Sequence, residues 1–148
     1  MFSRSCQYAL RSVIFLARNS QAEKKTGVKE IADTLAIPQQ FLAKILQQLS
    51  KHNLISSTKG PNGGFYLTDE NMTVSLLQIV ECIDGPDTLT SCVMGLPNCS
   101  TEKPCPLHIH VYDWREEFRN MLSSRRINDF LLSNQGDMED FMSGFLSR

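Results

Sequence analysis

Two amphipathic segments separated by a very short turn constrain the fold of this chain more than any other feature. Apolar residues recur at helical spacing in residues 28–35. They recur again in residues 38–53, where the set expected to face inward is Phe41, Leu42, Ile45, Leu46 and Leu49. Only Ala36 and Ile37 separate the segments, and Pro38 suits the start of a helix because its missing N–H would be unbonded there. Two short helices joined in this way form a helix-turn-helix.

A β-hairpin is predicted directly after the second helix. Residues 54–58 and 65–68 are β-prone, and the turn-forming residues 59–64 lie between them. Gly63 and Gly64 are expected to adopt positive φ at the tip of the hairpin. A helix-turn-helix followed by a hairpin is a winged helix. The predicted fold class is therefore mostly α with one small β-hairpin.

The remaining segments add helices on both sides of this unit. Residues 3–18 form an amphipathic helix, and residues 74–84 form another, capped by Thr73 and ended by Gly85 and Pro86. A long loop, residues 87–106, precedes a helix that runs from 107 to about 125, and a short helix near 127–132 precedes the tail. The predicted parts are a winged helix-turn-helix domain (1–72), a linking helix and cysteine-rich loop (73–106), and a long helix with a tail (107–148).

The long helix carries an apolar seam that can be used in two ways. Its apolar residues recur at steps of three and four, namely Leu107, Val111, Trp114, Phe118, Met121 and Leu122. The seam could belong to the core, but so small a domain leaves little chain to cover it. We therefore predict that it is a dimerisation helix, which pairs with a second copy of the chain.

The net charge of −1 conceals an asymmetry along the chain. Residues 1–68 hold nine basic and three acidic residues, hence +6, whereas residues 69–148 hold six basic and thirteen acidic residues, hence −7. A basic module joined to an acidic one is typical of a polyanion-binding domain with a separate regulatory region. Ordinary variation of surface charge along a chain is the alternative explanation.

The exposed face of the second helix has the residue types that read duplex DNA. Glutamine can pair with the major-groove edge of adenine, lysine binds phosphate or guanine, and the start of such a helix reaches the bases. We expect Gln39 and Gln40 to contact bases and Lys44 to contact phosphate or a base. The complete set of expected DNA contacts is Arg4, Tyr8, Gln39, Gln40, Lys44, Lys59, Pro61 and Asn62. A solvated helix face would use the same residue types.

Three cysteines in the long loop form a candidate metal site. Cys92, Cys99 and Cys105 follow the spacing C-x6-C-x5-C, and His108 comes three residues later. Thiolates with one imidazole suit zinc or an iron–sulfur cluster. The chain lacks the pattern of a secretory signal and any stretch of membrane-spanning length, so we expect a cytoplasmic protein, in which structural disulfides are rare.

The remaining cysteines and the absence of a catalytic motif complete this picture. Cys6 and Cys82 are expected to be inert, with Cys82 a small core residue. An oxidoreductase that uses Cys105 as a nucleophile is disfavoured, because no motif places a partner base beside it. The chain is therefore not expected to be an enzyme.

Together these features resemble the Rrf-type winged-helix transcription regulators, the family that contains IscR and NsrR. The likeness covers residues 1 to about 132 and is carried by residues 9–12, 30–32, 37, 41–42, the hairpin residues 59–65 and the three-cysteine loop. It implies a homodimer that crosses on the long helix and binds a palindromic or semi-palindromic operator. It also implies a cluster that changes DNA affinity when it is gained, lost or oxidised.

The resemblance also implies a ligand set. Cys92, Cys99, Cys105 and His108 match the IscR-like ligands, which hold a 2Fe–2S rather than a 4Fe–4S cluster, although the first gap is six residues here instead of five. Gln7 stands where the nitric-oxide-sensing branch has an aspartate, which favours His108 as the fourth ligand.

Two departures concern the DNA contacts. Ala43 replaces an acidic residue that discriminates between operators in IscR-like proteins, and Lys59 replaces the usual wing arginine. The predicted function is a dimeric DNA-binding regulator controlled by an iron–sulfur cluster. The alternative is a cluster-free regulator controlled by a partner protein, a metabolite or the redox state of its thiols.

Overall fold

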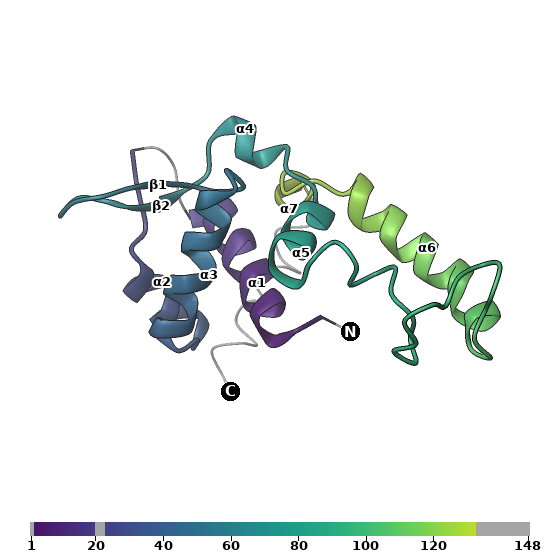
Figure 1. The fold of residues 1–148 in the computed structure, drawn as a ribbon. Coiled ribbons are helices and arrows are strands. Elements are labelled where there is room, and N and C mark those ends of the chain that lie inside the picture. The colour runs from purple at the N-terminus through teal and green to yellow at the C-terminus, as the bar shows by residue number, and fades with distance from the viewer. Residues whose placement is uncertain (1, 20–22, 133–148) are drawn as a thin grey trace.

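The computed structural model describes residues 2–19 and 23–132 and is mostly helical, with one antiparallel pair of strands (Figure 1). The elements are, in chain order, α1 (Arg4–Asn19), α2 (Val28–Leu35), α3 (Gln39–Lys51), β1 (Ser56–Thr58), β2 (Gly64–Tyr66), α4 (Asp69–Met72), α5 (Leu76–Asp84), α6 (His108–Ser124) and α7 (Asp129–Leu132). The predicted fold class is confirmed. The predicted tail beyond residue 132 lies outside the described residues.

Helix α1 is the centre of the core, where it packs against α2, α3 and α5. Among its fully buried side chains are Leu16 of α1, Ile31 of α2, Leu46 of α3 and Ile79 of α5. Ala36 adopts left-handed backbone angles (φ 54°), and this allows the tight turn between α2 and α3. Asn53, with φ 60°, prevents α3 from extending as far as predicted.

The prediction that Phe41 faces inward is wrong, because its side chain is 61% exposed. Leu42, Ile45, Leu46 and Leu49 are all buried and define the inward face of α3. Phe41 lies about 100° around the helix from Leu42 and therefore points off the edge of that face. The apolar character of Phe41 suits the core, but its position on the helix places the side chain outside it.

The hairpin β1–β2 is attached to Thr26, which lies two residues before the start of α2. Within the hairpin, Ser57 pairs with Phe65. Phe65 also exchanges two backbone hydrogen bonds with Thr26, of 2.9 Å and 2.8 Å. A Cβ on Gly64 would come within 2.8 Å of the Thr26 carbonyl oxygen, so this close approach requires glycine. The hairpin is thus fixed against the helix-turn-helix.

The prediction of positive φ is confirmed for Gly64 (φ 155°) but is wrong for Gly63. Gly60 takes the left-handed position instead, with φ 105°. Gly63 is needed for a different reason, since a Cβ there would collide with the backbone carbonyl of Thr58.

The start of α5 also differs from the prediction. Ser75, and not Thr73, caps this helix: its Oγ accepts a hydrogen bond from the Gln78 N–H (3.2 Å), and Gln78 Oε1 accepts one from the Ser75 N–H (2.9 Å). Thr73 instead ends α4, a short helix that the sequence pattern did not predict. Gly85 ends α5 as predicted, with φ 93°.

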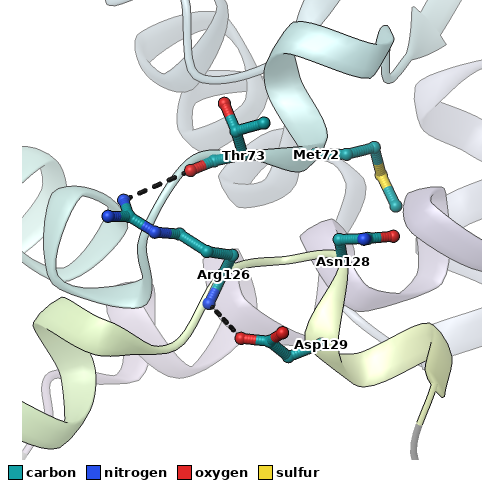
Figure 2. A pocket seen from close by; sticks show the side chains of 5 residues that line it. All are labelled: Met72, Thr73, Arg126, Asn128 and Asp129. Carbon is teal, nitrogen blue, oxygen red and sulfur yellow. Dashed lines mark hydrogen bonds between the residues drawn. The ribbon is translucent and has the colours of Figure 1, made fainter.

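Helix α6 extends away from the body, and the cysteine loop lies against its start (Figure 1). Its far end is joined to the segment between α4 and α5. The Ile127 N–H donates to the Val74 carbonyl (3.0 Å). Arg126 Nη1 donates to the Thr73 carbonyl (3.3 Å), while the backbone N–H of Arg126 donates to Asp129 (2.8 Å) and so fixes the turn that leads into α7 (Figure 2). Of the helices in the described ranges, none has the length and apolar character needed to cross a membrane.

Candidate functional site

One candidate site is the surface formed by α3 and the hairpin. Gln39, Gln40 and Lys44 are all exposed: Gln40 and Lys44 lie on the side of α3 away from its buried face, and Gln39 is the first residue of the helix. Lys59, Pro61 and Asn62 are exposed in the turn of the hairpin. The structure therefore presents these predicted contacts to solvent from the two elements that a winged helix offers to DNA.

A polar groove separates α3 from the hairpin. Its lining residues are Gln47, Ser50, Lys51, Ser57, Thr58, Lys59, Gly64 and Phe65, and no acidic side chain lies among them. Ser50 Oγ and Ser57 Oγ are 2.8 Å apart and share one hydrogen bond. Because either hydroxyl can donate in this pair, the proton of the other hydroxyl is available to a ligand. The sequence pattern could not place these hydroxyls beside each other, because their positions depend on how β1 packs beside α3.

The predicted contacts on α1 lie elsewhere. The Ser3 N–H donates a 2.9 Å hydrogen bond to Asp84, so the start of α1, where Arg4 lies, is beside the end of α5. Tyr8 is partly buried against the core, and the Arg11 guanidinium lies 5.9 Å from the centre of its ring. Contacts of Arg4 and Tyr8 with DNA stay predictions.

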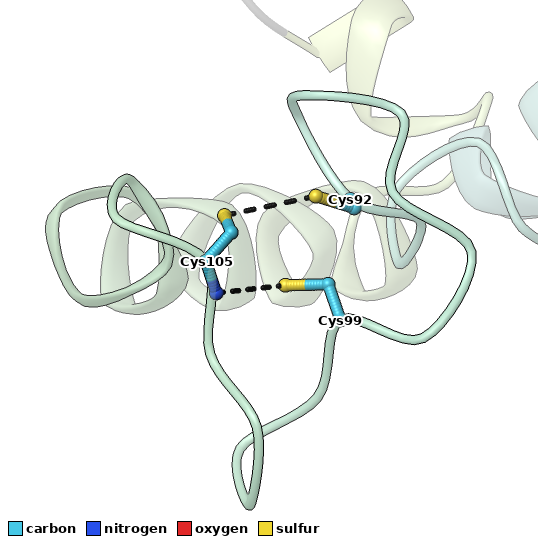
Figure 3. Close-up of side chains that lie close together, drawn as sticks. All are labelled: Cys92, Cys99 and Cys105. Atoms are coloured by element: carbon cyan, nitrogen blue, oxygen red, sulfur yellow. Dashed lines mark hydrogen bonds between the residues drawn. The ribbon is translucent and has the colours of Figure 1, made fainter.

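A second candidate site is the cysteine loop, where the three predicted thiols converge. The sulfur atoms of Cys92, Cys99 and Cys105 all lie within 4.8 Å of one another. Cys92 Sγ is 3.6 Å from Cys105 Sγ, and the Cys105 N–H donates to Cys99 Sγ at 3.3 Å (Figure 3). Cys105 is buried, whereas Cys92 and Cys99 are half-buried.

His108 lies beside this group of thiols. It is the first residue of α6, is only 8% exposed and stacks on Tyr112 with ring centres 5.3 Å apart. Its Nδ1 is 3.4 Å from Cys99 Sγ. Its Nε2 is buried and has no hydrogen-bond partner among the described residues. His110, by contrast, is exposed.

The local environment makes the three thiols unequal. Burial favours the neutral thiol of Cys92, but hydrogen bonds from the backbone of Leu96 and Met94 and from the other two cysteines outweigh burial and lower its pKa to about 7. At Cys99 the backbone N–H of Cys105 lowers the pKa, but burial and the neighbouring thiols raise it overall. Cys92 therefore supplies thiolate, the form that binds metals and reacts with oxidants, more readily than Cys99.

Arg115 is a residue of this site that the sequence analysis missed. Its side chain is 9% exposed, and its Nη1 donates a 2.6 Å hydrogen bond to the carbonyl of Ser91, the residue before Cys92. It lies seven residues after His108, about two helical turns, and so on the same face of α6. That spacing was visible in the sequence, but nothing local indicated that the loop would cover this face.

The other two cysteines lie outside the group of three. Cys6 is fully buried in α1, and burial, with a contribution from Asp84, raises its pKa to about 12. Cys82 lies at the edge of the core, where its Sγ is 3.9 Å from the Gln48 carbonyl oxygen and burial raises its pKa.

Comparison with known proteins identifies the family. The family model Rrf2, described as "Iron-dependent Transcriptional regulator", matches residues 2–132. The chain belongs to the Rrf2 family. An HTH-type transcriptional regulator of Aquifex aeolicus (strain VF5) is 30% identical over 88% of this chain and 91% of its own length. The HTH-type transcriptional regulator NsrR of Geobacillus kaustophilus is 29% identical over 84% of this chain and 85% of its own length.

A solved structure supports the fold of this Rrf2 protein. The B. subtilis global cysteine regulator CymR superposes with a TM-score of 0.71, at 23% identity, over 90% of this chain and 98% of that one. The resemblance inferred from the sequence motifs is therefore confirmed. This Rrf2 protein is a DNA-binding transcriptional regulator and not an enzyme.

Proposed function

We propose that this Rrf2 protein is a dimeric regulator whose affinity for its operator is controlled by an iron–sulfur cluster bound to Cys92, Cys99, Cys105 and His108. The observation that carries the proposal is the convergence of three sulfur atoms within 4.8 Å beside a buried imidazole. Such a soft donor set suits a cluster or zinc and does not suit a hard cation.

The residues present fit the proposed group. The Nε2 of His108 is a buried nitrogen without a partner in the described part of the chain, and burial of such an atom is unfavourable unless something binds it. When bound, a cluster supplies a centre that accepts electrons and reacts with oxidants. The three cysteines would hold it, and His108 would close the site from the start of α6. The resemblance to IscR-like proteins favours 2Fe–2S over 4Fe–4S.

A chain of contacts leads from this site to the DNA-binding helix. The cysteine loop lies between α5 and α6, and Arg119 of α6 pairs with Glu81 of α5 at 3.8 Å. Gln48 of α3 in turn donates a 2.7 Å hydrogen bond to the Cys82 carbonyl of α5. A bound cluster would restrain the loop and α6, and α5 would transmit that restraint to α3. A coupling free energy of about 1–3 kcal/mol is typical of such control.

Dimerisation through α6 follows from its exposed apolar side chains. Leu107, at the start of α6, and Trp114 and Met121 follow one another at seven-residue steps along one face of this projecting helix and are between 39% and 51% exposed (Figure 1). A single protomer would leave this apolar surface in water, and a second copy covers it by symmetry. The dimer would then present two copies of α3 to a palindromic or semi-palindromic operator in the cytoplasm.

The α3–hairpin surface suggests how each half-site is bound. With α3 in the major groove, Gln39 and Gln40 face the bases and Lys44 lies near phosphate or a base. The hairpin residues Lys59, Pro61 and Asn62 would lie at the minor groove. The DNA strand between the two grooves must then cross the polar groove, where Lys51 and the Ser50–Ser57 pair can bind phosphate.

A specific distance favours a second candidate function, control by thiol oxidation. Cys92 Sγ and Cys105 Sγ are 3.6 Å apart, and a modest loop movement would bring them to bonding distance. In that case a peroxide would accept two electrons and become water or an alcohol, while the two thiols lose their protons and form a disulfide.

Anaerobic purification tests the choice between these functions. Cluster control predicts a red-brown protein that contains iron and sulfide in similar amounts, whose visible absorption is lost in Cys99→Ala and kept in the control Cys82→Ala. An operator selected from random duplexes should bind the cluster-bound and cluster-free forms with different affinity. A colourless protein without iron, whose DNA affinity changes on reaction with peroxide, would reject cluster control and support the disulfide. Zinc in the loop would make the site structural.

A further inference from the structure

The buried face of α6 is polar at the end that carries the cysteine loop. The buried residues of α6 are His108, Arg115 and Leu122, which recur every seven residues and form one stripe. Leu122 belongs to the apolar core, whereas His108 and Arg115 face the loop. Each of these two residues has a buried nitrogen without a partner among residues 2–19 and 23–132, His108 Nε2 and Arg115 Nε. The loop therefore covers two unsatisfied nitrogen atoms.

The charge of Arg115 is also without a countercharge. Within the described ranges, no carboxylate oxygen lies within 4.0 Å of its guanidinium, which donates its hydrogen bond to the neutral carbonyl of Ser91. Arginine stays protonated at any physiological pH, so a side chain that is 9% exposed keeps its charge under the loop. Because a buried cation is costly unless an anion accompanies it, this arrangement calls for a negative group nearby.

We infer that Arg115 is the countercharge of the cysteine site and selects an anionic occupant, namely a thiolate-bound cluster. The inference rests on the proposed function and adds a positioning residue to it. Arg115 acts in two ways. Its hydrogen bond to Ser91 places Cys92 against α6, and its positive charge stabilises the negative charge that the thiolates bring under the loop. Reduction adds a further electron to the occupant, so the same charge favours the reduced form and raises the reduction potential.

These two contributions can be separated by substitution. Arg115→Met keeps an unbranched side chain and removes the charge, and Arg115→Gln serves the same purpose if the methionine variant does not fold. Arg115→Lys keeps the positive charge but loses the planar guanidinium group with its several N–H donors. Arg125→Met is the control, since Arg125 is an exposed arginine at the C-terminal end of α6, the end away from the cysteine loop.

The first measurement uses anaerobically purified, cluster-bearing full-length protein titrated with dithionite. Arg115→Met should have a lower midpoint potential than the unaltered protein and should lose its cluster about tenfold faster, the usual scale for residues that support metal ligands. Arg115→Lys should keep the potential while losing the cluster faster, and Arg125→Met should match the unaltered protein. A purely structural role would change the rate of cluster loss and leave the potential unchanged. An unchanged potential in Arg115→Met overturns the inference.

A second measurement needs no cluster. In the cluster-free protein, Cys92 is alkylated with anionic iodoacetate and with neutral iodoacetamide, and the ratio of the two rates is compared between variants by mass spectrometry. A neighbouring cation favours the anionic reagent, and the ratio cancels differences in thiol ionisation. The ratio should fall in Arg115→Met and be kept in Arg115→Lys. If the unaltered protein holds no iron or sulfide, the proposed function fails, and this ratio alone decides the inference. An unchanged ratio then overturns it.

Discussion

The side-chain amide of Gln48 donates a 2.7 Å hydrogen bond to the backbone carbonyl of Cys82, and the Cys82 thiol in turn lies 3.9 Å from the Gln48 carbonyl oxygen. This reciprocal contact joins α3, which carries most of the candidate DNA contacts, to α5, the helix that leads into the cysteine loop. It is therefore a direct link between the two candidate sites.

Removal of this contact should weaken the coupling between the cysteine site and DNA affinity, while leaving both candidate sites intact. We expect Gln48→Ala to bind the cluster and to recognise the same operator. The difference in the free energy of operator binding between the cluster-bound and cluster-free forms should be smaller by about 0.5–2 kcal/mol. Fluorescence anisotropy with a labelled operator measures both affinities. If the difference in Gln48→Ala equals that of the unaltered protein, the contact does not transmit the signal.

The α3–hairpin groove predicts a change in salt dependence. If Lys51 binds a phosphate, Lys51→Gln should weaken binding to all duplexes and reduce the slope of log K against log salt by about 1. Lys29→Gln, an exposed lysine of α2 that does not line the groove, is the control and should leave the slope unchanged. Parallel salt titrations of the two variants compare the slopes, and equal slopes would remove Lys51 from the interface.

The exposure of Phe41 predicts unequal stability effects at two adjacent positions. Leu42 is fully buried, so Leu42→Ala should lower the free energy of unfolding by about 2–5 kcal/mol. Phe41→Ala should change it by no more than about 0.5 kcal/mol, because the side chain is largely in water. Urea denaturation followed by circular dichroism tests both. A loss of several kcal/mol in Phe41→Ala would show that the side chain is covered in solution.

Burial of Cys6 predicts a stability that decreases at alkaline pH. Burial first, and then the nearby Asp84, raises the pKa of this thiol from 9.0 to about 12, so between those values it ionises in the unfolded chain but stays protonated in the folded one. The unfolded state then binds fewer protons, and the free energy of unfolding falls as pH rises above 9.0.

Cys6→Ala should remove this contribution, and denaturation at several alkaline pH values measures the difference. In the folded protein at pH 9, iodoacetamide should leave Cys6 unmodified and should label it once urea is added. Rapid labelling without urea would contradict the burial of this thiol.

Local patterns predicted most of the elements, because helical periodicity and turn residues act over a few neighbouring positions. Helix α2 has the predicted bounds, Gly85 ends α5, and the hairpin follows α3. Where two nearby residues could each cap the same helix, the helical pattern did not decide between them. Thr73 and Ser75 are both good capping residues, and Ser75 caps α5 because its partner Gln78 stands three residues further on.

Features of the candidate sites depended more on tertiary packing. The spacing of the three cysteines could predict that they converge, since a loop with proline and glycine bends easily. It could not predict Arg115, whose partner Ser91 is 24 residues away in the chain, or the Ser50–Ser57 pair between α3 and β1. Such contacts arise only when separate elements are brought together, and no local pattern encodes them.

The two backbone hydrogen bonds between Thr26 and Phe65 have a consequence for the proposed regulation of DNA binding. They fix the hairpin to the helix-turn-helix, so that in one protomer the two move together as one rigid unit. In the proposed dimer, a signal from the thiols would alter the separation and tilt of two such units, while each unit would keep its preference for particular base pairs. Operators would accordingly differ in their response through the number of base pairs between their halves, and lengthening or shortening that spacer would convert a responsive promoter into an unresponsive one.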